Sequence, residues 1–255
     1  MKLTSQKRIQ LPGLVWLLNF FLLPVALLLF ILRYIFRIRF LRIRNSRIGP
    51  MAGTDLFLRR QKLGMIASNG IRNIGLAHAQ TANAQFFAML KRKMKIISIP
   101  QPIPLRILLK ILACRSLLSR WKLFTELGFC ANEYYELNNS TTNLNFLPDE
   151  EEQGKALLRT MGVTRWFIWF HARDNAYLDQ LLQKRDQRHD FRNCSIDNYL
   201  LAAKYITKQG GYALRMGAKV EKELAVKNSH IIDYASNFRS DIGDVYLLVK
   251  CKFCV

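Results

Sequence analysis

The chain has 255 residues, half of them hydrophobic, and 39 Lys and Arg against 18 Asp and Glu give it a formal net charge of +21. This composition excludes a disordered tail, a collagen-like repeat and a small disulfide scaffold. Nucleic-acid binders and membrane-surface proteins both use positive charge, so both classes stay open at this point. Residues 1–130 hold 22 Lys and Arg but two acids, whereas residues 131–255 hold 17 and 16, which indicates two halves with different partners.

The most apolar segment covers residues 14–32, where Asn19 is the one polar residue and no side chain is charged. About 20 apolar residues suffice for a membrane-spanning helix. A signal peptide is the competing interpretation, but no small-residue cleavage site follows the segment. More basic residues follow the segment than precede it, which predicts a cytoplasmic location for the rest of the chain. Pro24 leaves open a kinked helix that enters and leaves on the same face.

The membrane explains the excess of Lys and Arg, because anionic lipid head groups attract cationic segments beside them. A second basic group, residues 91–95, fits either lipid contact or a solvated helix end. No nucleic-acid-binding motif accompanies the charge, so we expect no nucleic-acid partner. The five cysteines are widely spread apart from Cys251-x-x-Cys254, which predicts neither a disulfide framework nor a metal site.

The first half alternates strand and helix patterns. The expected strands cover residues 38–44 and 95–99, and a loop containing Gly and Pro covers residues 45–54. Expected helices cover residues 54–63, 81–91 and 105–118. Short strands that alternate with helices predict an α/β domain with a largely parallel sheet.

The second half follows a polar segment, residues 131–147, which we interpret as the domain boundary. A helix is expected from Pro148 to Met161, because Pro and the carboxylates after it favour a first helical turn. Strands are then expected at 166–170, 212–216 and from 252, with helices at 196–208 and 241–248. This order is half of a doubly wound domain and stops inside an element, so we expect an incomplete second domain.

Polar residues stand where two of these strands end, at the position where open α/β sheets bind ligands. His171, Arg173 and Asp174 follow the first strand, and Arg215 and Gly217 close the second. Arg presents a planar fork of donors to phosphate oxygens, and Gly allows the backbone to approach a ligand. The alternative for Arg173 is a salt bridge with a nearby acid, for which the candidates are Asp174, Asp179 and Asp190.

Further polar residues precede two helices. Ser195 and Asp197 stand before one, and Ser240 and Asp241 before the other. They either cap the free amides of the first turn or help the helix N-terminus to receive an anion. His171 is either a general base or a hydrogen-bonded residue at the end of a buried strand.

Three ordered motifs in the second half resemble a family of bacterial glycosyltransferases of surface-carbohydrate biosynthesis. They run from Phe170 to Leu178, from Phe191 to Tyr199 and from Leu214 to Gly217, and the segment from Ile231 to Phe253 continues the match. The His171-x-Arg173 pattern is also similar to a motif of fucosyltransferase-like enzymes, in which the Arg contacts the donor diphosphate.

The resemblance implies a fold of two Rossmann-like domains (GT-B-like), here with an N-terminal membrane helix. The expected parts are an anchor at 1–37, an acceptor-side domain at 38–147 and a partial nucleotide-sugar-binding domain at 148–255. The implied activity is transfer of a sugar from a nucleotide donor to a lipid-linked or surface-glycan acceptor at the bacterial inner membrane, without a cofactor. His171 is the candidate base, and the expected donor-binding residues are Arg173, Asp174, Arg215, Gly217, Ser240 and Asp241.

The chain departs from the family pattern at two places. Family members continue beyond the strand at 251–253 into a loop rich in Gly, Ser and Thr, whereas this sequence ends at Val255. Pro50 stands where the family has a His that is a candidate acceptor base. The alternative expectation is therefore a non-enzymatic, membrane-anchored fragment that binds lipid or a protein partner.

Overall fold

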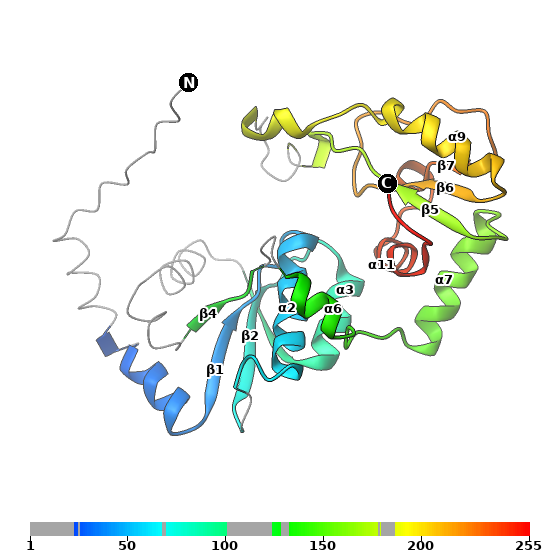
Figure 1. Cartoon of the computed structure of the whole chain (residues 1–255). Helices are drawn as coiled ribbons and strands as arrows, with labels where there is room; N and C mark the ends of the chain where they lie inside the picture. Colours follow the sequence, from blue (N-terminus) through cyan, green and yellow to red (C-terminus); the bar gives the residue numbers. More distant parts are fainter. Residues whose placement is uncertain are drawn as a thin grey trace. The chain divides into compact units, whose positions relative to one another are not determined.

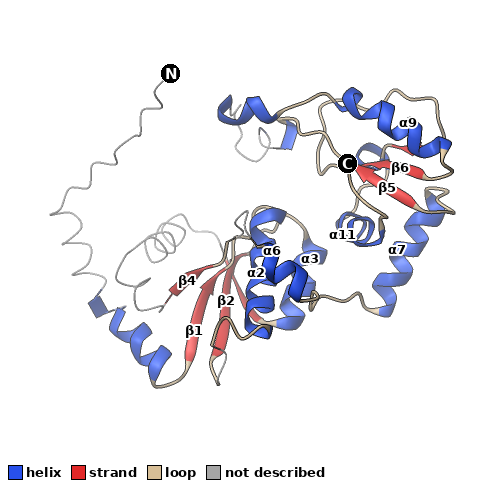
Figure 2. Cartoon of the chain, viewed as in Figure 1, coloured by secondary structure: helices blue, strands red, loops and turns tan. Residues whose placement is uncertain are grey.

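The computed structural model describes residues 23–24, 26–67, 70–100, 124–128, 133–177, 179 and 187–255. The chain forms two compact units, each with helices and a parallel sheet (Figures 1 and 2). Unit 1 comprises Met1–Asn83 and Phe87–Asn145, and unit 2 comprises Ala84–Phe86 and Phe146–Val255.

Unit 1 has a four-stranded parallel sheet in the order β3-β2-β1-β4. Its strands are β1 (Ile38–Arg42), β2 (Arg72–His78), β3 (Lys95–Ile99) and β4 (Phe124–Glu126). Its helices are α2 (Ile48–Lys62), α6 (Tyr134–Asn139) and α3 (Ala84–Lys93), of which the first three residues count with unit 2. Arg42 of β1 and Glu126 of β4 form an ion pair of 3.4 Å across the edge where these strands end.

The prediction of a loop over residues 45–54 is wrong, because α2 already begins at Ile48. Pro50 falls in the first turn, where a helix does not need the missing N–H. Gly53 permits a close approach, since an added Cβ would lie 2.7 Å from the backbone of Gly128. Strands β1 and β3 lie where they are expected, whereas the expected helix at 105–118 lies outside the described residues.

Unit 2 has a three-stranded parallel sheet in the order β5-β6-β7. Its strands are β5 (Phe167–Phe170), β6 (Tyr212–Arg215) and β7 (Ile231–Ile232). Its helices are α7 (Pro148–Thr160), η1 (Gln187–Arg192), η2 (Ile196–Tyr199), α9 (Leu200–Lys208), α10 (Tyr234–Asn237) and α11 (Asp241–Lys250). In place of the strand expected from Lys252, the described residues form an isolated parallel bridge between Cys254 and Trp169 of β5.

The two faces of this sheet bury separate clusters, because alternate side chains of a strand point to opposite faces. On one face, Phe167 and Leu214 pack with Leu247 of α11. On the other face, Ile168 and Ala213 pack with residues of η2 and α9. Gly154 of α7 lies against the ring of Tyr246 of α11, and this close contact joins the two helices on the first face.

The expected fold of two Rossmann-like domains with a membrane helix is wrong. Within the residues that the structure describes, no helix is long and apolar enough to cross a membrane. The helical residues near the expected span end before Arg37, whose φ of 54° is left-handed, and most of residues 14–32 lies outside the described part. Within the described ranges, the sheets have four and three strands, without the six-stranded, two-halved order of a Rossmann fold.

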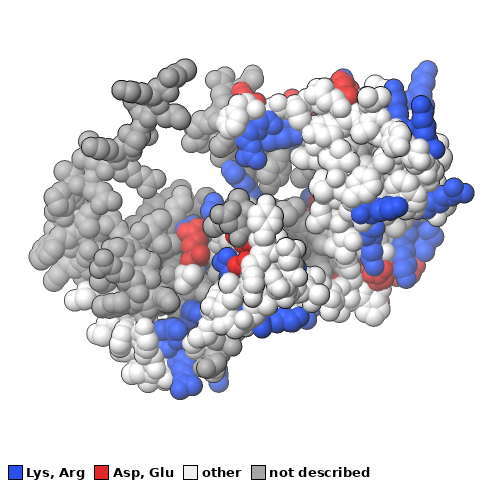
Figure 3. All heavy atoms as spheres, viewed as in Figure 1, with Lys and Arg blue, Asp and Glu red and all other residues white. Residues whose placement is uncertain are grey.

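The basic side chains of the described residues lie in several separate groups on the face shown in Figure 3. Separately from that view, the last turn of α3 forms a basic group in which Lys91, Arg92 and Lys93 follow one another. Arg92 donates a hydrogen bond to the carbonyl oxygen of Asn145, and Lys91 lies over the ring of Phe87. Cations at a helix C-terminus also complement the helix dipole, so this group has a structural explanation.

Candidate functional site

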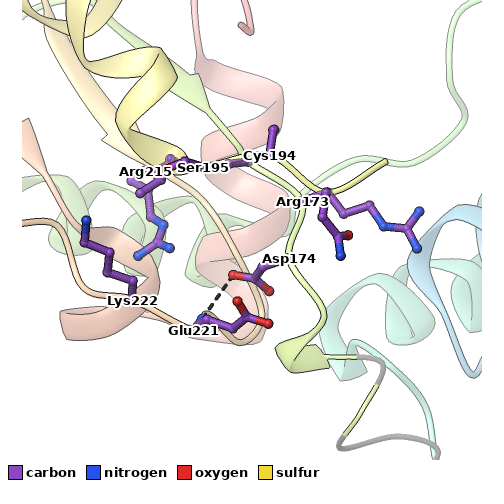
Figure 4. A pocket seen from close by; sticks show the side chains of 10 residues that line it. Arg173, Asp174, Cys194, Ser195, Arg215, Glu221 and Lys222 are labelled. Carbon is purple, nitrogen blue, oxygen red and sulfur yellow. Dashed lines mark hydrogen bonds between the residues drawn. The ribbon is translucent and has the colours of Figure 1, made fainter. Parts of the chain in front are cut away.

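A pocket of about 380 Å³ lies in unit 2, beside the carboxyl ends of β5 and β6. Figure 4 shows its labelled side chains. Three segments build it: the loop after β5, the loop before η2, and the loop after β6 together with the last residue of that strand. The lining residues are Ala172, Arg173, Asp174, Asn193, Cys194, Ser195, Ile196, Arg215, Glu221 and Lys222. The location agrees with the rule that open α/β sheets bind ligands at their carboxyl edge.

Arg215, the last residue of β6, is the most buried cation of this pocket, with 2% of its side chain exposed. Its Nη1 donates to both carboxylate oxygens of Asp233, at 3.3 and 3.2 Å. Its Nε is buried and has no hydrogen-bond partner among the described residues. Figure 4 shows the guanidinium pointing between Lys222 and Asp174. The guanidinium commits one nitrogen, Nη1, to Asp233 and lines the pocket, so it is suited to receive an anionic oxygen there.

Asp233, directly after β7, holds Arg215 in place. Its Oδ2 accepts hydrogen bonds from the amide of Leu224 at 2.9 Å and from Ser236 Oγ at 2.8 Å. Its Oδ1 accepts from the amide of Ser236 at 3.3 Å, which caps α10. The carboxylate is therefore fixed by three groups besides the Arg, and the guanidinium it holds is preorganised.

Arg173 and Asp174 follow β5 and both line the pocket. The guanidinium of Arg173 points away from Arg215 in Figure 4. Arg173 forms no ion pair within the described part of the chain. Asp174 accepts from the amides of Ala176, at 3.2 Å, and Glu221, at 3.0 Å. It thereby ties the loop after β5 to the loop after β6.

One rim of the pocket is an exposed ion pair between Lys222 and Asp197, at 2.8 Å. Lys222 donates a hydrogen bond to this carboxyl and lowers its pKa, and Ser195 Oγ lowers it further. Ser195 Oγ also accepts a hydrogen bond from the backbone amide of Asp197, so Ser195 caps η2. Capping was one of the two roles that the sequence left open for Ser195. Lys222 is free to rotate towards a bound anion, because a surface ion pair holds it only weakly.

His171, the candidate base, is exposed and does not line the pocket. Its Nδ1 lies 3.0 Å from the carbonyl oxygen of Met216. A carbonyl only accepts, so Nδ1 carries the proton and Nε2 keeps its lone pair when the ring is neutral. The contact orients a potential proton acceptor at the carboxyl edge of the sheet.

The remaining predicted donor-binding residues, Gly217, Ser240 and Asp241, are not among the residues that line the pocket. Ser240 Oγ accepts from the amide of Gly243 and so caps α11, and Asp241 pairs with Arg239 at 2.9 Å. An added Cβ on Gly217 would lie 2.7 Å from a side-chain carbon of Val220, so this Gly packs within its own loop. The structure explains these three residues by capping, ion pairing and packing.

Sequence reasoning missed Glu221 and Lys222, which come from an irregular loop without a recognisable pattern. Asn193 lies within the motif from Phe191 to Tyr199 but was not predicted as a site residue. Its position in the pocket depends on the tertiary fold, because the loop before η2 meets the end of β6. Among the described residues, no group of three or more His, Cys, Asp or Glu could hold a metal ion.

Comparisons with family models, with curated proteins and with solved structures find no match to this chain.

Proposed function

We propose that the chain is a glycosyltransferase that takes its sugar from a nucleotide-sugar donor. The observation that carries the proposal is the buried, incompletely paired guanidinium of Arg215 in a pocket at the carboxyl edge of a parallel sheet. Such a group suits a phosphate oxygen, and its burial strengthens the interaction. The motifs around residues 170–199 and 214–217, which resemble bacterial glycosyltransferases, favour a sugar nucleotide as the phosphate compound.

In the proposed reaction, Nε2 of His171 takes the proton of an acceptor hydroxyl. The acceptor oxygen forms a bond to the anomeric carbon of the donor, and the bond from that carbon to the phosphate oxygen breaks. The nucleoside diphosphate leaves with the electron pair, and Arg215 stabilises the charge that develops on it. The resemblance supports a lipid-linked or surface-glycan acceptor at the bacterial inner membrane.

Cys194 lines the pocket and has a free, exposed thiol, so its reactivity reports on binding in the pocket. Alkylation of Cys194 by iodoacetamide, followed by peptide mass spectrometry on the full chain, measures access to the pocket. We expect at least one member of a panel of UDP-, GDP- and dTDP-sugars to slow this alkylation. Sugar transfer is then measured with the protective donor and a lipid-linked saccharide.

Two matched variants separate the arginines. Arg215→Lys keeps the charge but removes the fork of donors, so we expect about a ten- to hundredfold weaker protection by the donor. Arg173→Lys makes the same change in a side chain that points away from Arg215, and we expect less than a threefold effect. Absence of protection by every sugar nucleotide, with no variant changing the rate, would refute the proposal.

A further inference from the structure

A group of large apolar side chains is exposed on the helical residues 26–34 and the turn after them, directly before β1 in unit 1 (Figure 1, blue). Residues three and four apart share one face of a helix, so Leu27, Phe30 and Tyr34 form a row. Between 41% and 69% of each residue in this group is exposed. We call the group the apolar stripe; its members are Leu27, Leu28, Phe30, Tyr34 and Ile35.

The other side of the same helix is turned away from solvent. Ala26 is fully buried and Leu29 is half-buried. The helix therefore buries one side and presents the apolar stripe on the other. A contiguous apolar surface that stays exposed on a folded chain marks an interaction site.

The apolar stripe ends at three arginines where β1 and β2 begin. The guanidinium of Arg33 lies 5.5 Å from the centre of the Tyr34 ring. Arg37, with its left-handed φ of 54°, turns the chain from the helix into β1. The carbonyl oxygen of Arg37 accepts a hydrogen bond of 2.7 Å from the amide of Arg72, the first residue of β2. We call Arg33, Arg37 and Arg72 the basic end of the stripe.

The positive charge at this basic end is not compensated. In the part of the chain that the structure describes, none of its three arginines forms an ion pair. The first acidic residue of the sequence is Asp55, so residues 1–54 carry cations alone. Burial lowers the pKa of Arg39, and the charge of Arg33 lowers it further, as expected beside unpaired positive charge.

We propose that the apolar stripe lies in the surface of a bilayer that contains anionic lipids, with the helix parallel to the membrane plane. Its apolar side chains enter the boundary between head groups and acyl chains, and Arg37 and Arg72 contact lipid phosphates. Tyr34, with Arg33 over its ring, lies at the level of the head groups, where aromatic and cationic side chains are favoured.

This contact differs from the membrane-spanning helix that the sequence predicted. A spanning helix is apolar on all sides, whereas this helix buries one side in the protein and ends at the basic end of the stripe. A bilayer also fits better than a second copy of the chain, because a second copy of residues 1–54 would bring no acid to the arginines. The inference does not depend on the proposed function.

Flotation of the full chain with lipid vesicles tests the contact. One set of vesicles is phosphatidylcholine alone, and in the other about a third of the lipid is phosphatidylglycerol. We expect the affinity for the anionic vesicles to be about tenfold higher or more. This preference should disappear in about 1 M NaCl, because salt screens the attraction between the arginines and the phosphates.

The double variant Leu27→Ser with Phe30→Ser tests the apolar stripe. It should weaken binding to both kinds of vesicle about a hundredfold, or about tenfold for each apolar side chain that enters the lipid. Leu201→Ser with Tyr205→Ser is the matched control in α9 of unit 2, where these residues are 81% and 62% exposed. The control should bind as the unaltered chain does.

The double variant Arg37→Gln with Arg72→Gln tests the basic end of the stripe. It should weaken binding to the anionic vesicles about 10- to 30-fold and leave binding to phosphatidylcholine unchanged. Arg44→Gln with Arg47→Gln removes the same charge from exposed residues beyond the carboxyl end of β1. This control should keep the preference for the anionic vesicles.

Three results would overturn the proposal. The first is equal affinity for the two kinds of vesicle, and the second is vesicle binding that neither the stripe variant nor the arginine variant weakens. The third is a chain that binds no vesicles but forms oligomers, measured by light scattering, that the stripe variant dissociates. That result would assign the stripe to an interface between copies. Since no sugar nucleotide is used, failure of this inference and failure of the proposed function are observed separately.

Discussion

Replacing Arg215 by Met is expected to destabilise unit 2 by about 3 kcal/mol. The ion pair with Asp233 is buried, with 2% and 6% of the two side chains exposed. Removing one partner of a buried pair costs about 3–5 kcal/mol, because the other charge stays buried without compensation. We expect the lower end of this range, since Asp233 keeps its hydrogen bonds to Leu224 and Ser236.

Asp233→Asn is expected to cost more, about 4–5 kcal/mol, because it leaves a buried guanidinium that already has one unpaired donor. In the double variant, Arg215→Met with Asp233→Asn, no charge remains to be compensated. Its cost should therefore be below that of either single variant, and the difference from the sum of the two measures the coupling of the pair.

Hydrogen exchange of the amides in β6 provides the assay, because a fully buried strand exchanges through the larger opening events. A loss of about 3 kcal/mol corresponds to roughly a hundredfold faster exchange. Effects that add to within about 0.5 kcal/mol would show that the two residues are not coupled. That result would also remove the basis for a preorganised Arg215 in the pocket.

Three further predictions concern packing, acid sensitivity and catalysis. Gly154→Ala should lower the melting temperature, because the added methyl overlaps the ring of Tyr246 in α11. Gly49→Ala is the control, since the space around Gly49 is open, and it should raise the free energy of unfolding by up to about 1 kcal/mol. Arg60 donates a hydrogen bond to Glu136 and holds the pKa of that carboxyl below its usual value. The pair therefore stabilises unit 1 at neutral pH, and this stabilisation is lost as the pH falls below about 4. Glu136→Gln should make the stability of unit 1 less dependent on pH in the acid range, and an unchanged profile of acid unfolding would contradict the pairing. His171→Asn should reduce the rate of sugar transfer about 10²–10⁴-fold and leave the protection of Cys194 by the donor unchanged. If transfer and protection were lost equally, His171 would act in donor binding and not in proton transfer.

The local patterns of the sequence were sufficient for several elements of both units. Strand β3 and helix α7 were predictable, because alternation and a Pro-led, acidic first turn are local signals. Strands β2 and β4 were not predicted. For β4 the reason is its length, because its three residues become a strand only by pairing with β1. The expected loop at residues 45–54 failed for a similar reason, because Gly53 serves helix packing against Gly128 and not a turn.

Local patterns predicted β5 and β6 as buried strands and placed Arg173, Asp174 and Arg215 at their ends. The contacts that each of these side chains makes depend on the tertiary fold. Asp233, distant in sequence, holds Arg215, while Asp174 turns to the amide of Glu221 in another loop. Strand ends are set by local periodicity, but the direction of a side chain beyond them depends on partners that the fold brings from elsewhere in the chain.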